Sequence, residues 1–322
     1  MKFSIAVIVL MYVAIVFSQP ADYVHINKII AKLEQDQIVT GMWSSALHPS
    51  NAAGLVEANG FPTAEEAISK PMLDYILIDM EHQPFDVQAL REFILALNSK
   101  REVLIKGNLQ PNISVLVRIP ADGNQPVHAC IKQVLDIGVH GVVVPHVRSA
   151  AEARRIVSAC RYPQTEDSPY PDPVGERGAS PWLASYAWGL SMPEYVDRAD
   201  VWPLNPKGDL LAVVMIEDKE GIENLDDILD VKGIGAVIFG PYDYSFAAGY
   251  PGQTTHPEVA GKWNHVKSIC DRHGVPLVGF GNPDNAKDLL EQGYQMLLCG
   301  HDIRLNHGVP QVLDIITRYI KN

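Results

Sequence analysis

Two carboxylates in the sequence each follow a run of apolar residues. Glu217 follows LLAVVMI, and Asp243 follows AVIFGPY. Each run predicts a buried strand, and an unpaired charge at the end of a buried strand is costly. Two carboxylates completed by water suit a hard divalent cation such as Mg²⁺ or Mn²⁺, which leaves positions open for an oxygen-rich substrate. The spacing alone is equally compatible with ion pairs to arginine or lysine on neighbouring strands.

An arginine and a histidine also follow predicted strands. Arg118 comes after VLV, and its planar fork of donors suits a carboxylate or an enolate oxygen, although it could instead neutralise Glu81 or Glu217. His82 comes directly after an acidic pair, Asp79 and Glu81. A histidine in this position could be a general base, and it is equally compatible with a hydrogen-bonded structural role.

Eight short runs rich in valine, isoleucine and leucine alternate with stretches of helical spacing, as expected for parallel strands buried on both faces. The predicted strands are residues 38–45, 75–81, 115–120, 141–147, 211–217, 236–243, 276–281 and 295–302. The clearest predicted helices are residues 65–69, 87–98, 126–137, 150–159, 222–229, 257–273 and 282–292. This alternation predicts an α/β fold, a closed (β/α)8 or TIM barrel, whose active site lies at the C-terminal ends of the strands.

One segment departs from the regular spacing. Residues 162–209 are rich in proline, and we expect them to form an insertion between the fourth and fifth strands. Within it, residues 164–180 are too polar and too interrupted for a helix and predict a loop, which is either functional or poorly ordered. Residues 182–190 predict a short helix. Because neither a repeat nor a linker indicates a second domain, we assign residues 19–322 to a single barrel domain.

The first residues have the pattern of a secretory signal peptide. Lys2 precedes an uncharged apolar run over residues 3–17, and the small residues Val16 and Ser18 follow the pattern of a cleavage site. The alternative is a membrane anchor, but the run is shorter than the roughly 20 residues that cross a bilayer. We therefore predict a signal peptide over residues 1–18, cleavage near Ser18, and an exported protein without a membrane span after cleavage.

Composition limits the other classes of function. With 322 residues, 47% of them hydrophobic and 20% charged, the chain can build one large core. The net charge is −12 and lysine and arginine do not cluster, so we expect no nucleic-acid partner. Neither a serine nucleophile elbow nor a phosphate-binding glycine motif occurs. The four cysteines lack C-x-x-C spacing and are predicted to be buried free thiols, although export would permit a disulfide among Cys130, Cys160, Cys270 and Cys299.

Nine stretches of the sequence resemble one family of enzymes. They are GMW (41 to 43), YILIDMEHQP (75 to 84), LVRIP (116 to 120), IKQVLDIGVHGVVVPHV (131 to 147), RRIVSACRYP (154 to 163), GERG (175 to 178), MIE (215 to 217), NLDDILDVKGIGAVIFGPYDYS (224 to 245) and GYPGQTTHPEV (249 to 259). In this order they resemble the HpcH/HpaI aldolase/citrate lyase family. The resemblance is to the class II pyruvate aldolases that act on 2-keto-3-deoxy sugar acids and 4-hydroxy-2-ketoheptanedioate, and it implies a barrel of the type that binds phosphoenolpyruvate or pyruvate.

The resemblance also implies a metal site and a substrate site. Glu217 and Asp243 would ligate a divalent cation (Mg²⁺, Mn²⁺ or Co²⁺), and the backbone N–H groups of Tyr242 and Asp243 would help to hold the substrate carboxylate. Met215 would lie beside the bound substrate. Arg118 would stabilise the enolate oxygen.

The same resemblance implies the reaction and the assembly. His82, oriented by Asp136, would move the proton that retro-aldol cleavage transfers. The substrate would be a 4-hydroxy-2-keto acid, and the products pyruvate and an aldehyde. We also expect a homo-oligomer in which the helix predicted over residues 310–320 packs between subunits.

Two positions depart from the family pattern and keep alternatives open. The family often has GPADLS where this chain has GPYDYS (240 to 245), and many members have glutamine where this chain has Met215. One alternative is a lyase for malyl-type or citramalyl-type thioesters within the same superfamily. Another is an exported barrel that binds a keto acid without turnover, which Met215 and Tyr242 suggest. Retention of the buried charged residues argues against the second alternative.

Overall fold

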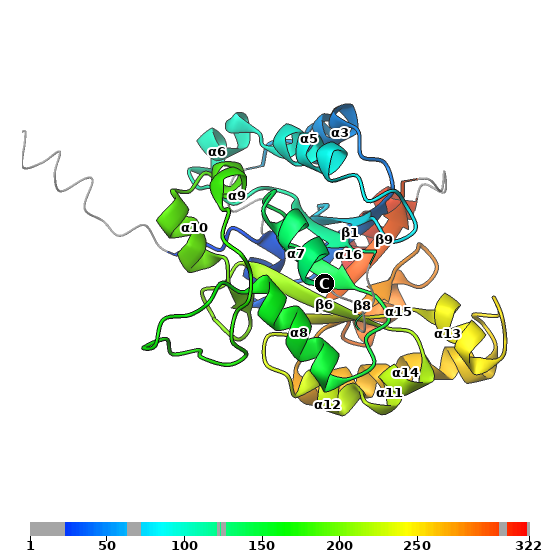
Figure 1. Cartoon of the computed structure of the whole chain (residues 1–322). Helices are drawn as coiled ribbons and strands as arrows, with labels where there is room; N and C mark the ends of the chain where they lie inside the picture. Colours follow the sequence, from blue (N-terminus) through cyan, green and yellow to red (C-terminus); the bar gives the residue numbers. More distant parts are fainter. Residues whose placement is uncertain (1–22, 63–71, 121–122, 124–126, 303–307, 321–322) are drawn as a thin grey trace, which may run out of the picture.

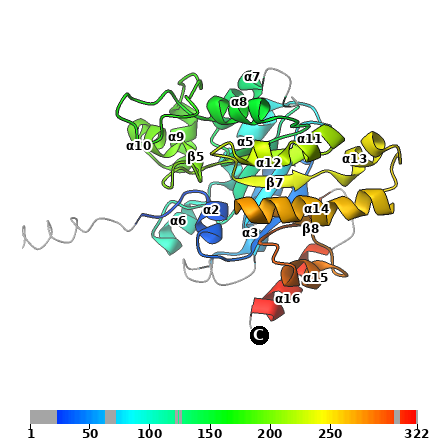
Figure 2. The ribbon, with the colours of Figure 1, turned by 90° about the horizontal axis from the view of Figure 1, so that it is seen from below.

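The computed structural model describes residues 23–62, 72–120, 123, 127–302 and 308–320. Eight parallel strands form a ring in which each strand pairs with the next, and the ring is closed by pairing of β1 with β9 and of β4 with β6 (Figures 1 and 2). The strands are β1 (Val39–Ser44), β2 (Tyr75–Asp79), β3 (Ser114–Arg118), β4 (Gly141–Val144), β6 (Leu210–Ile216), β7 (Ala236–Phe239), β8 (Leu277–Phe280) and β9 (Met296–His301). The predicted TIM-like barrel is therefore confirmed. The predicted signal peptide and the helix predicted over residues 65–69 lie outside the described residues.

Alternate residues of each strand face opposite sides of the barrel wall. In β6, Leu211, Val213 and Met215 belong to the cluster inside the barrel, whereas Ala212 and Val214 belong to the cluster between the strands and the helices. This two-residue period is the normal geometry of a strand in a barrel. It continues past the strand ends, so polar residues in phase with the interior cluster open onto the mouth of the barrel.

Helices cover the outside of the barrel (Figure 2). They are α3 (Pro49–Asn59), α5 (Val87–Leu97), α6 (Lys100–Lys106), α7 (His128–Leu135), α8 (Ala150–Cys160), α11 (Lys219–Glu223), α12 (Leu225–Leu229), α13 (Pro241–Ala248), α14 (Pro257–His273), α15 (Ala286–Glu291) and α16 (Gly308–Ile320). None of the helices within the described residues is long and apolar enough to span a membrane. All four cysteines are free thiols, and three of them are buried, in agreement with the sequence prediction.

The insertion carries its own short elements. It contains α9 (Trp182–Trp188), α10 (Met192–Arg198) and β5 (Val201–Trp202), and β5 pairs with the first residues of β6 rather than joining the ring. The fully buried side chain of Arg161 bonds the Asp200 carboxylate at 2.6 Å and the carbonyl oxygen of Tyr170 at 2.8 Å. Because Arg161, at the end of α8, binds both Asp200 and Tyr170, which lies in the predicted loop, it fixes that loop against α8.

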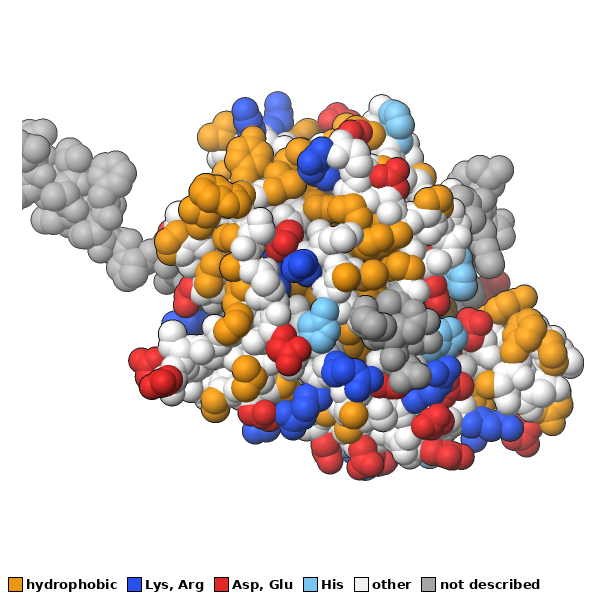
Figure 3. Space-filling model, in the orientation of Figure 1, with side chains coloured by type: hydrophobic (Ala, Val, Ile, Leu, Met, Phe, Trp, Pro, Cys, Tyr) orange, Lys and Arg blue, Asp and Glu red, His pale blue; other side chains and the backbone are white. Residues whose placement is uncertain are grey.

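Surface composition differs between two regions. On the face in Figure 3, acidic and basic side chains are interspersed along the lower edge, over α11, α12 and α14, whereas apolar side chains gather at the upper left, over α6 and α9. These two helices carry large exposed apolar residues, with Leu104 at 83%, Trp182 at 71% and Tyr186 at 72% exposure. Exposed apolar residues concentrated in this way are a common mark of a protein interface.

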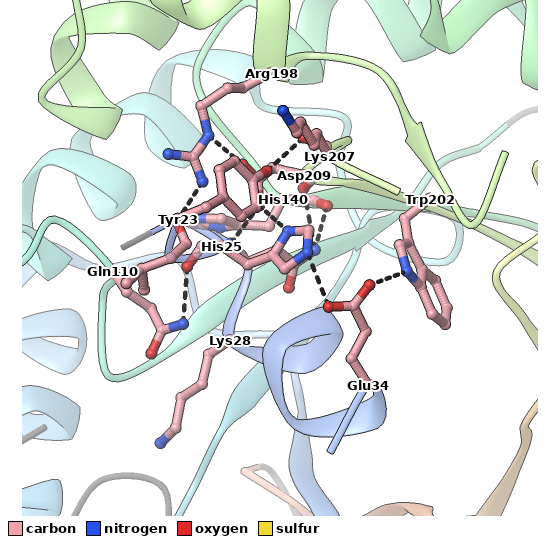
Figure 4. Close-up of polar contacts among 12 residues, drawn as sticks. Tyr23, His25, Lys28, Glu34, Gln110, His140, Arg198, Trp202, Lys207 and Asp209 are labelled. Atoms are coloured by element: carbon pink, nitrogen blue, oxygen red, sulfur yellow. Dashed lines mark hydrogen bonds and ion pairs between the residues drawn. The ribbon is translucent and has the colours of Figure 1, made fainter. Parts of the chain in front are cut away.

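The N-terminal ends of the strands are closed by a short helix that the sequence analysis missed. Helix α2 (Lys28–Leu33) inserts Ile29, Ile30 and Leu33 into the interior cluster. The buried carboxylate of Asp74 forms ion pairs with Lys28 and Lys32, and each Nζ lies 2.7 Å from a carboxylate oxygen. The segment before α2 is held in place by polar contacts with the fully buried Asp209, to which His25 and Asn27 bind (Figure 4).

We expect Asp209→Ala to lower the free energy of unfolding by about 3 to 5 kcal/mol, because it leaves buried partners without their counter-charge. The Asp209 carboxylate binds His25 Nδ1 at 2.8 Å, Arg198 Nε at 2.6 Å and the backbone N–H of Asn27 at 3.2 Å. Urea denaturation measures the loss. Asp226→Ala is the control, because Asp226 also pairs with an arginine and a histidine but lies exposed on the surface, where such pairs contribute little. Equal stability of the two variants would contradict the prediction.

Candidate active site

An arginine and two carboxylates meet at the C-terminal ends of β2 and β3. Arg118 Nε donates to Asp79 Oδ1 at 2.9 Å, and Arg118 Nη1 lies 2.7 Å from Glu81 Oε2. The guanidinium also lies over the Trp43 ring, with Cζ 4.5 Å from the ring centroid. All three charged side chains are in phase with the inward-facing residues of their strands. Arg118 is therefore a fixed cation at the mouth of the barrel.

The two carboxylates respond differently to this arginine. Burial raises the pKa of Glu81, and the charges of Arg118 and two nearby histidines only partly oppose that effect. Burial also acts to raise the pKa of Asp79, but the hydrogen bond and charge of Arg118 outweigh it, so the pKa of Asp79 lies below its usual value. Asp79 is thus the carboxylate that Arg118 keeps ionised, and Glu81 is the one that is protonated more easily.

Glu217 follows β6 and has two oxygens in different surroundings. Oε1 accepts the backbone N–H of His146 at 2.8 Å, whereas the buried Oε2 has no hydrogen-bond partner among the described residues. Gly240 makes room for Oε2, because a Cβ atom at that position would lie only 2.4 Å from it. Burial, with the nearby charges of Asp243 and Glu81, raises the pKa of Glu217 to about 8. A cation would stabilise the ionised form of this carboxylate and give Oε2 a partner.

Asp243 lies on a helix, and the prediction that residues 236–243 form a strand is wrong at its C-terminal end. Strand β7 stops at Phe239, and Pro241 is the first residue of α13. Proline is common at this position because the N–H of the first helical residue has no acceptor within the helix. Asp243 therefore sits in the first turn of α13, near enough for its charge to raise the pKa of Glu217.

The described residues contain no group of three or more histidine, cysteine, aspartate or glutamate side chains arranged to hold a metal ion. What the site offers is two carboxylates, one with a buried and unpartnered oxygen. This donor set suits Mg²⁺ or Mn²⁺, which commonly keep several water ligands or bind substrate oxygens. Glu217 and Asp243 therefore fit a divalent cation that is shared with water and substrate.

The structure does not bring His82 and Asp136 together within one chain. His82 follows β2 at the mouth, where its side chain is 63% exposed and its Nε2 lies 3.5 Å from Glu81 Oε2. Asp136 caps the C-terminal end of α7 and accepts a hydrogen bond from Arg177 Nη2 at 2.8 Å. Barrel helices run antiparallel to the strands, so the end of a helix lies toward the opposite end of the barrel from the mouth.

The two predicted substrate-binding positions have opposite environments. Met215 is 3% exposed and belongs to the interior cluster, two residues before Glu217. Tyr242 is 59% exposed and its ring lies 5.4 Å from that of Phe246, on the outer side of α13. The backbone N–H groups of Tyr242 and Asp243 are in the first helical turn, where they have no intrahelical acceptor and can bind an anion.

Three further features of the mouth were not assigned a role from the sequence. His146 donates its backbone N–H to Glu217, and its ring lies between Glu217 and Glu81, at 3.5 and 3.7 Å. Trp43 supports Arg118 and stacks on His301, with ring centroids 6.3 Å apart. Asp302 accepts the Ser44 hydroxyl at 2.5 Å and two backbone N–H groups after β1. The one sequence signal that could identify His146, His301 and Asp302 is their position at or just after the end of a strand.

Comparisons by sequence match most of this chain to known proteins. A family model described as HpcH/HpaI aldolase/citrate lyase matches residues 62–307. The 2-keto-3-deoxy-L-rhamnonate aldolase of Escherichia coli strain K12 is 33% identical over 284 residues, which cover 87% of this chain and 88% of the relative.

Solved structures show the same fold. The HpcH/HpaI aldolase from Desulfitobacterium hafniense DCB-2 is 28% identical, with a TM-score of 0.64 over 84% of this chain and 89% of that chain. An HpcH/HpaI aldolase/citrate lyase family protein from Burkholderia cenocepacia J2315 is 22% identical, with a TM-score of 0.68 over 90% of this chain and 99% of that chain. The chain therefore belongs to the HpcH/HpaI aldolase/citrate lyase family.

Proposed function

We propose that this protein is a class II aldolase that cleaves a 4-hydroxy-2-keto acid, of the 2-keto-3-deoxy sugar acid type, to pyruvate and an aldehyde. The observation that carries the proposal is the buried Glu217, whose Oε2 has no hydrogen-bond partner in the described part of the chain and whose pKa is raised in part by the nearby charge of Asp243. Arg118 at the same mouth supplies the fixed cation that such a reaction needs. The similarity to 2-keto-3-deoxy-L-rhamnonate aldolase supports this class of substrate.

Glu217 and Asp243 would hold the divalent cation, Mg²⁺, Mn²⁺ or Co²⁺. When bound, the cation would polarise the keto and carboxylate oxygens of the substrate. The first-turn N–H groups of Tyr242 and Asp243 would hold the substrate carboxylate. Many members of the family have glutamine where this chain has Met215, whose side chain would form an apolar wall of the site. Orientation of the substrate would therefore depend more on the cation held by the two carboxylates and on the first-turn N–H groups of α13.

Cleavage requires that the C4 hydroxyl lose a proton, that the C3–C4 bond break, and that its electron pair move toward the C2 oxygen. Arg118 would stabilise the negative charge that develops on this oxygen, because a preorganised cation in a water-poor site needs no reorganisation. His82 is accessible at the mouth and would accept the hydroxyl proton. Return of the proton to C3 gives pyruvate, and the other fragment leaves as an aldehyde.

We also propose that the protein is a homo-oligomer. The exposed apolar residues of α6 and α9 support this assembly, as does α16, whose Val312 and Ile316 are buried while Ile320 is 51% exposed. Export through the predicted signal peptide over residues 1–18 remains part of the proposal, on the sequence pattern alone. The mass of the protein recovered from the medium of expressing cells tests cleavage near Ser18.

Removal of divalent metal is expected to abolish pyruvate release. EDTA treatment should stop cleavage of a panel of 2-keto-3-deoxy and 4-hydroxy-2-keto acids, and added Mg²⁺, Mn²⁺ or Co²⁺ should restore it, because two carboxylates with water form a readily reversible site. Pyruvate is measured by coupled NADH oxidation, with added pyruvate as the control for the coupling enzyme. Turnover that is indifferent to EDTA would argue against the metal.

A further inference from the structure

His146 has a backbone conformation that is unusual for its residue type. Its φ is +52°, and the only other described residue besides glycine with positive φ is Asp36, at +53°. The left-handed region places Cβ close to the neighbouring carbonyl oxygen, so residues other than glycine adopt it at a cost. Such a conformation persists only where the surroundings fix it, and it clusters at functional sites.

The contacts of the adjacent residues explain how His146 is fixed. Strand β4 ends at Val144, and Pro145 has no N–H, while its carbonyl oxygen accepts the N–H of Gly123 at 3.1 Å. Val147 then donates its N–H to the carbonyl oxygen of Met215 in β6, also at 3.1 Å. The chain therefore rejoins β6 directly after His146. Between these two anchors, the N–H of His146 turns away from the strand ladder and toward Glu217.

The backbone of His146, rather than its ring, makes the firm contact with Glu217. The N–H to Oε1 distance is 2.8 Å, whereas Nδ1 lies 3.5 Å from the same oxygen and Nε2 lies 3.7 Å from Glu81 Oε1. The two ring distances exceed those of normal hydrogen bonds. Glu217 thus has one oxygen held by a backbone donor and one, Oε2, that is buried next to Gly240 and has no hydrogen-bond partner among the residues that the structure describes.

We propose that His146 is a positioning residue for the divalent cation: its left-handed backbone holds Glu217 Oε1 and so presents Oε2 as the ligand atom. The inference rests on the proposed function, because the cation is part of that proposal. Hydrogen-bond partners that orient a ligating side chain typically change metal affinity by about 10-fold to 100-fold when they are removed. Since the proposed donor is the backbone, the effect of a substitution should follow its cost in the left-handed region and not the loss of the imidazole.

The test is titration of the full chain with Mn²⁺ alone, with free Mn²⁺ measured by electron paramagnetic resonance. His146→Gly and His146→Asn should bind Mn²⁺ within about threefold of the parent, because both residues tolerate positive φ. His146→Val should bind at least about tenfold more weakly, because a β-branched residue strongly disfavours this conformation. Asp36→Val is the matched control, since it places the same residue in the same backbone conformation near the opposite end of the barrel, after α2. It should lower the melting temperature and leave Mn²⁺ affinity unchanged.

The outcomes separate the two proposals. If His146→Gly loses as much affinity as His146→Val, the ring is the important group and the inference is overturned. Equal Mn²⁺ affinity of His146→Val and the parent overturns it too. Should His146→Val fail to fold, His146→Ala takes its place, and an affinity equal to that of His146→Gly overturns the inference. Absence of Mn²⁺ binding by the parent chain would remove the metal-dependent function itself, together with this inference.

Discussion

Replacement of Glu217 by glutamine is expected to reduce kcat/KM for pyruvate release by at least about 1,000-fold. The cation contributes several kcal/mol to the stabilisation of the developing charge, and each 1.4 kcal/mol corresponds to a tenfold change in rate. Glutamine keeps the shape of Glu217 and can still accept the His146 N–H at Oε1. Its uncharged NH₂ group, a donor, then takes the place of Oε2. Coupled NADH oxidation and Mn²⁺ titration should show the losses of activity and of metal binding together.

Stability should not follow activity in this variant. The raised pKa of Glu217 shows that burial disfavours its charge, so a neutral residue of the same shape should leave the melting temperature of the metal-free protein unchanged or higher. Glu102→Gln is the matched control, because Glu102 is also buried and accepts the N–H of Asn112 at 3.2 Å, on α6 outside the barrel. That control should retain full activity. Pyruvate release by Glu217→Gln within tenfold of the parent would remove Glu217 from the metal site.

The barrel could be predicted from sequence because its strands are buried on both faces. A strand such as LLAVVMI has no polar face, and its apolar run ends where the strand leaves the core, so strand position and the inward direction of Glu217 follow from the pattern. Short elements carry a weaker signal. Helix α2 has six residues and β5 has two, which is too few for a helical or alternating period to be recognised.

Positions that depend on the path of the chain between strands could be predicted less well. The apolar residues AVIFGPY continue beyond β7, so the predicted strand over residues 236–243 is too long: Gly240 and Pro241, where α13 begins, lie inside the predicted range. Pairing of His82 with Asp136 was implied by the resemblance, whereas the predicted barrel itself places the C-terminal end of the helix over residues 126–137, and Asp136 with it, away from the mouth within one chain. The left-handed backbone of His146 has no compositional signal, because it is set by contacts of Pro145 and Val147 with other segments.

Arg118→Ala should lower kcat by about 100-fold to 1,000-fold, the usual effect of removing one donor to a developing oxyanion. Mn²⁺ affinity should not weaken, because loss of a positive charge near Glu217 does not disfavour a cation. The variant should also be less stable by about 3 to 5 kcal/mol, because Asp79 and Glu81 would be left as unpaired carboxylates with side chains only 6% and 10% exposed. Arg154→Ala is the control, since its ion pair with Asp172 lies on the surface. A normal rate in Arg118→Ala would remove Arg118 from the mechanism.

Arg118→Lys separates the contribution to catalysis from the contribution to folding. Lysine retains the charge that Asp79 and Glu81 require, and its ammonium can still lie over the Trp43 ring, so much of the stability should return. It lacks the planar fork that binds both carboxylates while presenting a further donor to the substrate. If the geometry of the guanidinium stabilises the enolate, kcat of Arg118→Lys should stay close to that of Arg118→Ala although urea denaturation shows a recovered fold. A parallel recovery of kcat and stability would instead mean that Arg118 contributes to turnover only by holding the two carboxylates in place.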